Sequence, residues 1–194
     1  MSKGLIITLV VIGVLVVSVF VFISWGTGVY DKSVGLQEGV NAEFADVQAT
    51  YQRRADLIPN LVATVKGAAE NEKGILTEVT QARAGIVNAK TPEDLEIMGR
   101  KINTAINLAF EAYPQIRSTE NFQALQTELE GTENRINVAR QRYNASIREY
   151  NTYVRGFFKR MALNWFGGGE DFAVKKGFEA AEGSDKASKV DFSK

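Results

Sequence analysis

The 194-residue sequence contains neither cysteine nor histidine. Their absence excludes disulfides, cysteine nucleophiles, histidine general bases and the ligand sets of nearly all zinc, copper and haem sites. An excess of one charge is also missing, because 23 basic residues balance 23 acidic ones. No basic stripe interleaved with aromatic residues is present either. We therefore expect no metal, no cofactor and no nucleic-acid partner.

Charge is absent altogether from residues 4–30. Within this stretch, the apolar run 5–25 is interrupted only by Thr8, Gly13, Ser18 and Ser24. As a helix the run would be about 30 Å long, which matches the hydrocarbon core of a bilayer. A secretory signal peptide usually has an apolar region of only ~7–15 residues and a small-x-small cleavage site, which GTGVYDK does not offer. We interpret residues 1–30 as a retained, single-pass transmembrane anchor.

The orientation of this anchor follows from the basic residues beside it. Lys3 and the amino terminus lie on one side, and Lys32 lies on the other. The positive-inside rule then favours a cytoplasmic amino terminus. We expect the rest of the chain on the extracytoplasmic side.

After the anchor, four glycines predict a flexible junction: Gly26, Gly28, Gly35 and Gly39. Apolar residues then recur at steps of three and four and predict a helix over about residues 37–89. They are Val40, Phe44, Val47, Tyr51, Ile58, Leu61, Val65, Ala68, Ile75, Val79, Ala82 and Ile86. Pro59 predicts a kink near residues 56–58, at which the helix could be split.

Two further helices are predicted. Thr91 is suited to an N-cap, Pro92 to the first helical position and the carboxylates Glu93 and Asp94 to the positive end of the helix dipole, so a helix of roughly 21 residues should follow. Ser118 or Thr119 then precedes a helix of about 35 residues whose apolar stripe is typical of coiled coils. The stripe comprises Phe122, Leu125, Leu129, Thr132, Ile136, Ala139, Tyr143, Ser146, Tyr150, Tyr153 and Phe157.

Together these patterns predict an all-α protein with one amino-terminal transmembrane helix and an elongated antiparallel helical bundle over residues 31–166. Gly167 to Gly169 should end the folded region, so we expect residues 167–194 to form a glycine-rich hinge and a flexible polar tail. Aromatic residues spaced along this tail could instead dock into a groove on a neighbouring molecule. They are Phe172, Phe178 and Phe192.

The order of residues at 51–80 is more distinctive than a generic helix. It contains RRADLIPNLV from Arg53, then Val65-Lys66-Gly67, and then Glu70, Glu72 and Lys73. Further motifs are Tyr113-Pro114, Asn121-Phe122, Leu125-Gln126, Glu128-Leu129-Glu130, Glu133, Ile136, Ala139-Arg140, Tyr143-Asn144, Tyr150-Asn151, Phe178 to Ala180 and Lys189 to Phe192. Over nearly its whole length the chain resembles the LemA family of bacterial membrane proteins. Relatives often end the last long helix with Phe-Pro, where this chain has Gly156-Phe157-Phe158.

This resemblance implies an antiparallel helical bundle tethered to the bacterial cytoplasmic (inner) membrane. It implies no activity, because none is established for the family.

The strongest local candidate for an interaction surface surrounds Pro59. It comprises Arg53, Arg54, Asp56, Pro59 and Asn60. In a functional interpretation, the kink exposes these polar groups for docking. In a structural interpretation, which we prefer, Arg54 or Asp56 forms an ion pair between helices and Asn60 hydrogen-bonds near the proline. Replacing Pro59 with alanine would separate the two.

Paired carboxylates are the only remaining candidates for acid–base chemistry. Glu70/Glu72 and Glu128/Glu130 make poor pairs, because helix residues two apart point away from each other, and Glu93/Asp94 are explained by the helix cap. These residues are more simply interpreted as solvated. We name no catalytic residue.

Aromatic residues are dense near the end of the last helix, from Tyr143 to Phe166. Either this end approaches the membrane surface, with Lys159 and Arg160 at anionic head groups, or the aromatic residues belong to the core. The first alternative requires the chain to fold back to its anchor.

The leading functional hypothesis is a non-enzymatic, membrane-anchored scaffold that assembles with its own copies in the lipid bilayer and organises or shapes it. One alternative is an adaptor for a membrane-bound protease or another membrane-protein partner. A second is a cofactor-free enzyme that uses carboxylates, which would need a pocket with convergent acidic or lysine side chains.

Overall fold

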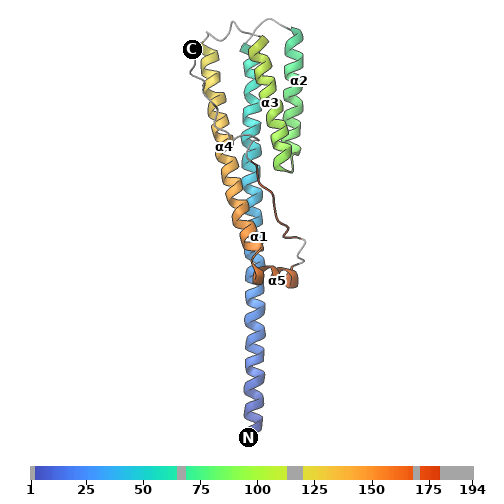
Figure 1. The fold of residues 1–194 in the computed structure, drawn as a ribbon, viewed down its shortest axis with the longest axis vertical. Helices are drawn as coiled ribbons and strands as arrows, with labels where there is room; N and C mark the ends of the chain where they lie inside the picture. The colour runs from blue at the N-terminus through green and yellow to red at the C-terminus, as the bar shows by residue number, and fades with distance from the viewer. Residues whose placement is uncertain (1–2, 65–68, 113–119, 168–170, 180–194) are drawn as a thin grey trace, which may run out of the picture. The chain divides into compact units, whose positions relative to one another are not determined.

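A computed structural model describes residues 3–64, 69–112, 120–167 and 171–179 (Figure 1). The described residues form helices and no strand, so the all-α prediction is confirmed. The helices are α1 (Lys3–Thr64), α2 (Ala69–Asn88), α3 (Pro92–Ala112), α4 (Glu120–Val154) and α5 (Phe157–Phe166).

Helix α1 runs without a break from the apolar run through the glycine-rich stretch that follows it. The predicted flexible junction and the predicted helix start near residue 37 are therefore wrong. One side of the stretch is buried at Val29, Ser33 and Val40, whereas a Cβ atom at Gly28, Gly35 or Gly39 would meet open space. Burial of the packed side outweighs the cost of about 1 kcal/mol that each glycine adds relative to alanine.

The predicted helix over residues 37–89 is divided between α1 and α2. Pro59 lies inside α1, which continues to Thr64, and α2 begins at Ala69. A proline removes one backbone hydrogen bond from a helix interior, yet Ala55 and Ile58 are buried directly before it. Packing on this side of α1 holds the helix across the proline.

Helix α3 begins at the predicted residue, Pro92. The Asp94 amide donates to Thr91 Oγ1 at 3.1 Å, and Asp94 Oδ2 accepts from the amides of Thr91 and Lys90, each at 3.1 Å. This reciprocal pair is a capping box, in which the two side chains satisfy amides that the first turn leaves unpaired.

The apolar stripe of α4 is buried as predicted at Leu129, Thr132, Ile136, Ala139, Tyr143 and Tyr150. Beyond Tyr143 the buried positions shift by one residue, because Ile147 and Val154 are also buried. The helix then ends at Val154, and Phe157 begins α5 with 78% of its surface exposed. The prediction that Phe157 belongs to the core stripe is wrong.

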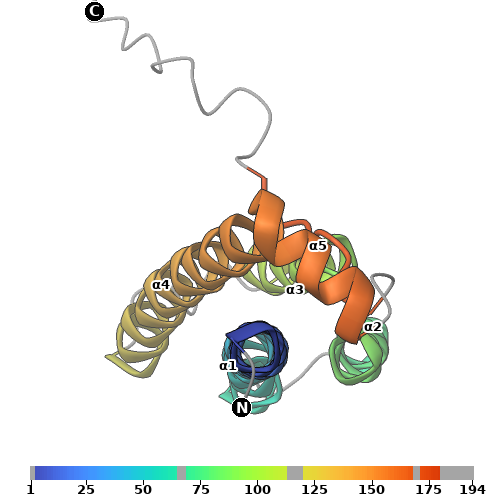
Figure 2. The ribbon, with the colours of Figure 1, turned by 90° about the horizontal axis from the view of Figure 1, so that it is seen from below.

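The chain forms two compact units. The first contains α1 up to Thr50, α4 from Arg135, α5 and the segment up to Lys175. Within it, α5 runs crosswise to α1. Figure 2 shows α1 end-on and α5 from the side. The second contains α1 from Tyr51, all of α2 and α3, and α4 up to Asn134.

In the second unit, α2 and α3 pack against each other along their lengths (Figure 1). Gly85 on α2 makes room for Met98 on α3, because a Cβ atom there would lie 3.0 Å from Met98 Cγ. Among the side chains described in these helices, the buried apolar ones include Ala82, Ile86, Leu95, Ile102, Ala105 and Ile106.

Candidate functional site

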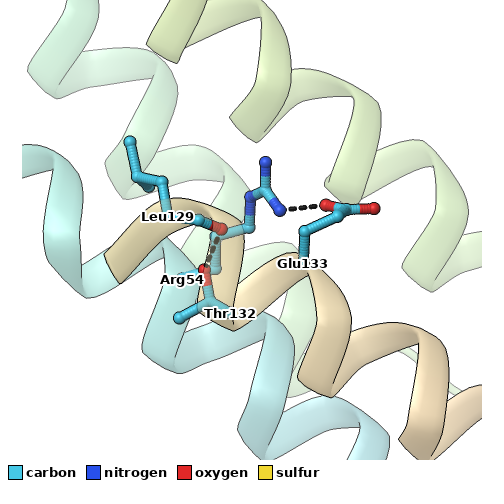
Figure 3. A network of polar contacts seen from close by, with 4 residues as sticks. All are labelled: Arg54, Leu129, Thr132 and Glu133. Atoms are coloured by element: carbon cyan, nitrogen blue, oxygen red, sulfur yellow. Dashed lines mark hydrogen bonds and ion pairs between the residues drawn. The ribbon is translucent and has the colours of Figure 1, made fainter. Parts of the chain in front are cut away.

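The polar residues around Pro59 lie in the second unit, on α1. Arg54 forms an ion pair with Glu133 of α4, as Figure 3 shows. The Arg54 side chain is 12% exposed and that of Glu133 is 48% exposed, so the pair is buried at its cationic end. Beside it, the buried Thr132 hydroxyl donates to the Leu129 carbonyl at 2.8 Å (Figure 3). On α4, Glu133 directly follows the buried Thr132 and so reaches Arg54, while the Thr132 hydroxyl keeps a hydrogen bond within the helix.

Asp56 forms a second ion pair, with Arg83 of α2, at 2.8 Å. Both side chains are about half exposed, so solvent screens this pair more than the first. The expected ion pairing of Arg54 or Asp56 between helices is confirmed for both residues. Arg53 is exposed and Pro59 is half-buried. The side chain of Asn60 lies outside the described part of the structure, and docking at this surface stays a prediction.

Asp94 is not suited to act as a general acid. The Thr91 side chain, and then the Lys90 amide, lower the pKa of Asp94, whereas a general acid at neutral pH needs a raised one. Glu128 and Glu130 are exposed, and Glu130 accepts a hydrogen bond from Gln126 at 3.2 Å. The side chains of Glu70 and Glu72 lie outside the described residues. Within the described part, no three acidic residues are grouped closely enough to hold a metal.

A shallow depression of about 430 Å³ lies on the apolar run of α1. It is lined by Val17, Ser18, Val21, Phe22 and Trp25. Its one hydroxyl, on Ser18, already donates to the Val14 carbonyl at 2.8 Å. The lining can therefore accommodate hydrocarbon, and its one side-chain N–H donor is the indole of Trp25.

The second candidate site lies in the first unit, where α5 meets the end of the apolar run. The Phe22 ring is 6.0 Å from Trp25, 5.8 Å from Trp165 and 5.6 Å from Phe166, centroid to centroid. A Cβ atom at Gly26 would lie 2.6 Å from Phe166 Cδ2, so this glycine allows the ring to pack on the α1 backbone. We call these four aromatic residues the aromatic cluster. The chain does fold back to its apolar run.

Two lysine side chains of the first unit lie over the ring of Tyr153 of α4. Lys159 Nζ is 4.1 Å from the Tyr153 ring centroid and Lys32 Nζ is 5.3 Å from it. These are cation–π distances. Burial raises the pKa of Tyr153 and also that of Tyr150, so both phenols stay neutral at physiological pH. Neither is suited to act as a base.

Part of the predicted tail is fastened to its own chain. Phe172 is buried, with its ring 5.4 Å from Tyr30 of α1 in an edge-on arrangement. The Asn151 side chain donates to the Lys175 carbonyl at 2.8 Å and accepts from the Lys175 amide at 3.0 Å. Tyr150 donates its hydroxyl to the Ala173 carbonyl at 3.1 Å. Residues 171–175 therefore depart from the expectation of a free tail.

Phe178 is also buried, and Phe192 lies outside the described residues. Docking of these aromatic residues on another molecule stays a prediction. Sequence reasoning missed Tyr30 and Asn151 as partners of this segment. The available signal was the Tyr-Asn pair at Tyr150-Asn151, where a carboxamide adjoins the buried stripe of α4.

Comparison with known proteins gives two results. Residues 43–192 match the sequence profile of the LemA family. A relative named Protein LemA, from Metamycoplasma hominis, is 25% identical over 123 residues, which cover 61% of this chain and 53% of that protein. The chain thus spans about half the length of the curated relative that it matches.

Proposed function

The chain belongs to the LemA family, and we propose that it is a membrane-anchored, non-enzymatic helical scaffold that assembles with its own copies and organises or shapes the bilayer. The bundle is proposed to lie on the extracytoplasmic side of the bacterial inner membrane. Lys3 is the residue that supports this orientation.

The observation that carries the proposal is the continuity of α1. This helix is long and apolar enough to cross a membrane, and the side chains of its residues 5–25 are exposed in the folded chain. From Val29 onward one face of the same helix is buried in the first unit. A bilayer is the environment in which the exposed part is stable, because lipid removes its apolar surface from water.

An unbroken helix transmits orientation between the bilayer and the packed part of the first unit. A flexible tether would let the folded part tumble, whereas a continuous helix has no loop to absorb rotation. An anchor of this kind suits a protein that arranges its neighbours laterally more than it suits a tethered enzyme.

Light scattering on the detergent-solubilised full-length chain tests the self-assembly. We expect one discrete mass that is a multiple of the monomer. The contacts of Phe172 and Lys175 mean that a truncation at residue 170 would disturb the first unit itself. The informative deletion removes residues 180–194 and keeps those contacts.

Phe192→Ala tests docking by the tail, with Ser193→Ala as the matched control. If Phe192 docks on a neighbouring copy, Phe192→Ala and the deletion reduce the mass to that of a monomer, and Ser193→Ala does not. A monomeric full-length chain would contradict self-assembly. It would favour the adaptor alternative, for which Arg53→Glu in a pull-down of membrane partners is the next test.

A further inference from the structure

We propose that α5 is a second membrane contact, whose exposed apolar face lies in the interface of an anionic phospholipid bilayer beside the end of the transmembrane run. This inference rests on the proposed anchoring of α1 in the same bilayer. It assigns the lipid surface as the partner of a face that no protein group in the described structure covers.

The ten residues of α5 divide into a buried side and an exposed apolar side. Ala162 and Leu163 are buried. Four large side chains are exposed: Phe157, Phe158, Met161 and Trp165. At roughly 100° per residue these four fall within a single arc of about 100° on the helix surface. A continuous apolar stripe of this kind indicates a partner, because singly scattered apolar residues would not line up.

The position of α5 along α1 indicates which partner. Trp165 contacts Phe22, Phe166 contacts both Phe22 and Gly26, and Gly167 lies against Tyr30. From Trp165 to Gly167, the contacts with α1 therefore move from Phe22, inside the apolar run, to Tyr30, beyond its end. Trp165, which is 73% exposed, is on the bilayer-directed side of α5. It lies at the level where interfacial tryptophans are favoured.

The charge around α5 favours an anionic surface. Between Glu149 and Glu170 the chain carries Arg155, Lys159 and Arg160 and no acidic residue. Arg160 is exposed at the edge of the apolar stripe. Basic residues that flank an apolar helix face are attracted to the negative potential of anionic lipids.

The rest of the first unit stabilises α5, which is short for a helix that binds a membrane surface. An isolated helix of ten residues is marginal in water, but the packing of Phe166 on Phe22 of α1 and the burial of Leu163 hold α5 in place. Because α1 is itself anchored, the face of α5 stays near the interface and binds at a high effective concentration. A second copy of the chain could also cover the stripe. It would not explain why Trp165, at one end of the stripe, lies beside the end of the apolar run.

The sequence provides two matched probes, because its only tryptophans are Trp25 and Trp165. Trp25→Phe leaves Trp165 as the reporter on α5, and Trp165→Phe leaves Trp25 as the reporter on α1. Each full-length variant is reconstituted into vesicles of phosphatidylcholine and phosphatidylglycerol. The measurement is fluorescence quenching by lipids brominated near the head group, together with quenching by aqueous iodide.

We expect both tryptophans to be quenched by bromolipid and shielded from iodide. Quenching of Trp25 without quenching of Trp165 would overturn the role of α5 while leaving the anchor intact. No quenching of either would contradict the anchor itself. Shielding of Trp165 from iodide without bromolipid quenching would assign the stripe to a second copy and also overturn the proposal.

The double variant Phe157→Glu and Phe158→Glu, made in the Trp25→Phe background, tests the stripe directly. We expect it to lose bromolipid quenching of Trp165 and to shift the emission of Trp165 to longer wavelength. Thr152→Glu, at an exposed polar position of α4 in the same unit, is the matched control for added charge and should keep the quenching. Circular dichroism checks that both remain helical. Unchanged quenching in a folded double variant would contradict the inference.

Discussion

Helices α3 and α5 have the same kind of amphipathic pattern, but they differ in how much of the apolar face is buried. In the second unit, α3 buries Leu95, Ile102 and Ile106. In the first unit, α5 buries Ala162 and Leu163 but leaves Phe157 and Trp165 exposed. Pattern alone therefore identifies an apolar face but not what covers it. For α3 the cover is protein, and for α5 we infer lipid.

The polar contacts of the two units differ in the same way. The second unit joins its helices with ion pairs, Arg54 with Glu133 and Asp56 with Arg83. The first unit uses aromatic packing and the pairing of Asn151 with the Lys175 backbone. The aromatic contacts and the Asn151 pairing carry no net charge to desolvate, unlike the two ion pairs.

The largest expected effect contrasts the two apolar faces. Ile102→Ala should lower the free energy of unfolding by about 2–5 kcal/mol, because it leaves a cavity in the second unit. Phe158→Ala should change it by no more than about 0.5 kcal/mol, because the ring is already exposed. Urea unfolding of the detergent-solubilised chain, followed by circular dichroism, compares them. Equal losses would mean that the face of α5 is covered by protein.

Smaller changes in the free energy of unfolding are expected when alanine replaces glycine, and their sign depends on whether the glycine is closely packed. A Cβ atom at Gly99 of α3 would lie 2.6 Å from Cε1 of the buried Tyr51, so Gly99→Ala should cost about 1–3 kcal/mol. Gly39 of α1 faces open space, and Gly39→Ala should stabilise by up to about 1 kcal/mol. Thermal unfolding of both variants gives the sign. A destabilising Gly39→Ala would mean that another molecule packs closely there.

The ion pairs of the second unit should differ in strength. Glu133→Gln leaves the mostly buried Arg54 without its counter-charge and should cost about 1–2 kcal/mol. Asp56→Asn breaks a half-exposed pair and should cost no more than about 0.5 kcal/mol. Both variants conserve side-chain volume, so urea unfolding compares charge alone. If Asp56→Asn costs more, the exposed fraction is the wrong guide to the strength of these pairs.

Features set by neighbouring residues could be predicted from the sequence. The start of α3 depends on Thr91, Pro92 and Asp94, which lie within one turn. The α4 stripe was predicted through Tyr143 because a constant period describes it. Beyond that residue the prediction holds at Tyr150, but Ile147 and Val154 are buried in place of Ser146 and Tyr153, and the helix ends before Phe157.

Features that depend on distant residues could not be predicted. The contact of Gly26 on α1 with the Phe166 ring joins residues that are far apart in the sequence. Ion pairing of Arg54 could be expected, but its partner Glu133 becomes evident only when α4 is placed against α1. The fastening of residues 171–175 needs Tyr30 and Asn151 from two different helices. Composition described this segment as a free tail because composition contains no tertiary contact.

The smallest expected effect is a pH dependence at the start of α3. The Thr91 side chain, and then the Lys90 amide, lower the pKa of Asp94 in the folded chain. The ionised Asp94 side chain therefore stabilises the folded state fully above the ordinary carboxyl pKa of about 3.9, and this stabilisation is lost as pH falls through the lowered pKa. Asp94→Asn should remove this acid-range dependence, and Thr91→Ala should bring the pKa of Asp94 back toward its ordinary value.

NMR titration of the Asp94 carboxyl measures that return, and urea unfolding across the acid range measures the linked stability. Glu93→Gln, a neighbouring exposed carboxylate, is the control and should keep the acid-range dependence on Asp94. Helix α5 provides the contrast, because Gly156 precedes it without a side-chain cap. Acid should weaken the start of α3 and leave that of α5 unchanged. An Asp94→Asn variant with the full acid-range dependence would mean that the capping box does not form in solution.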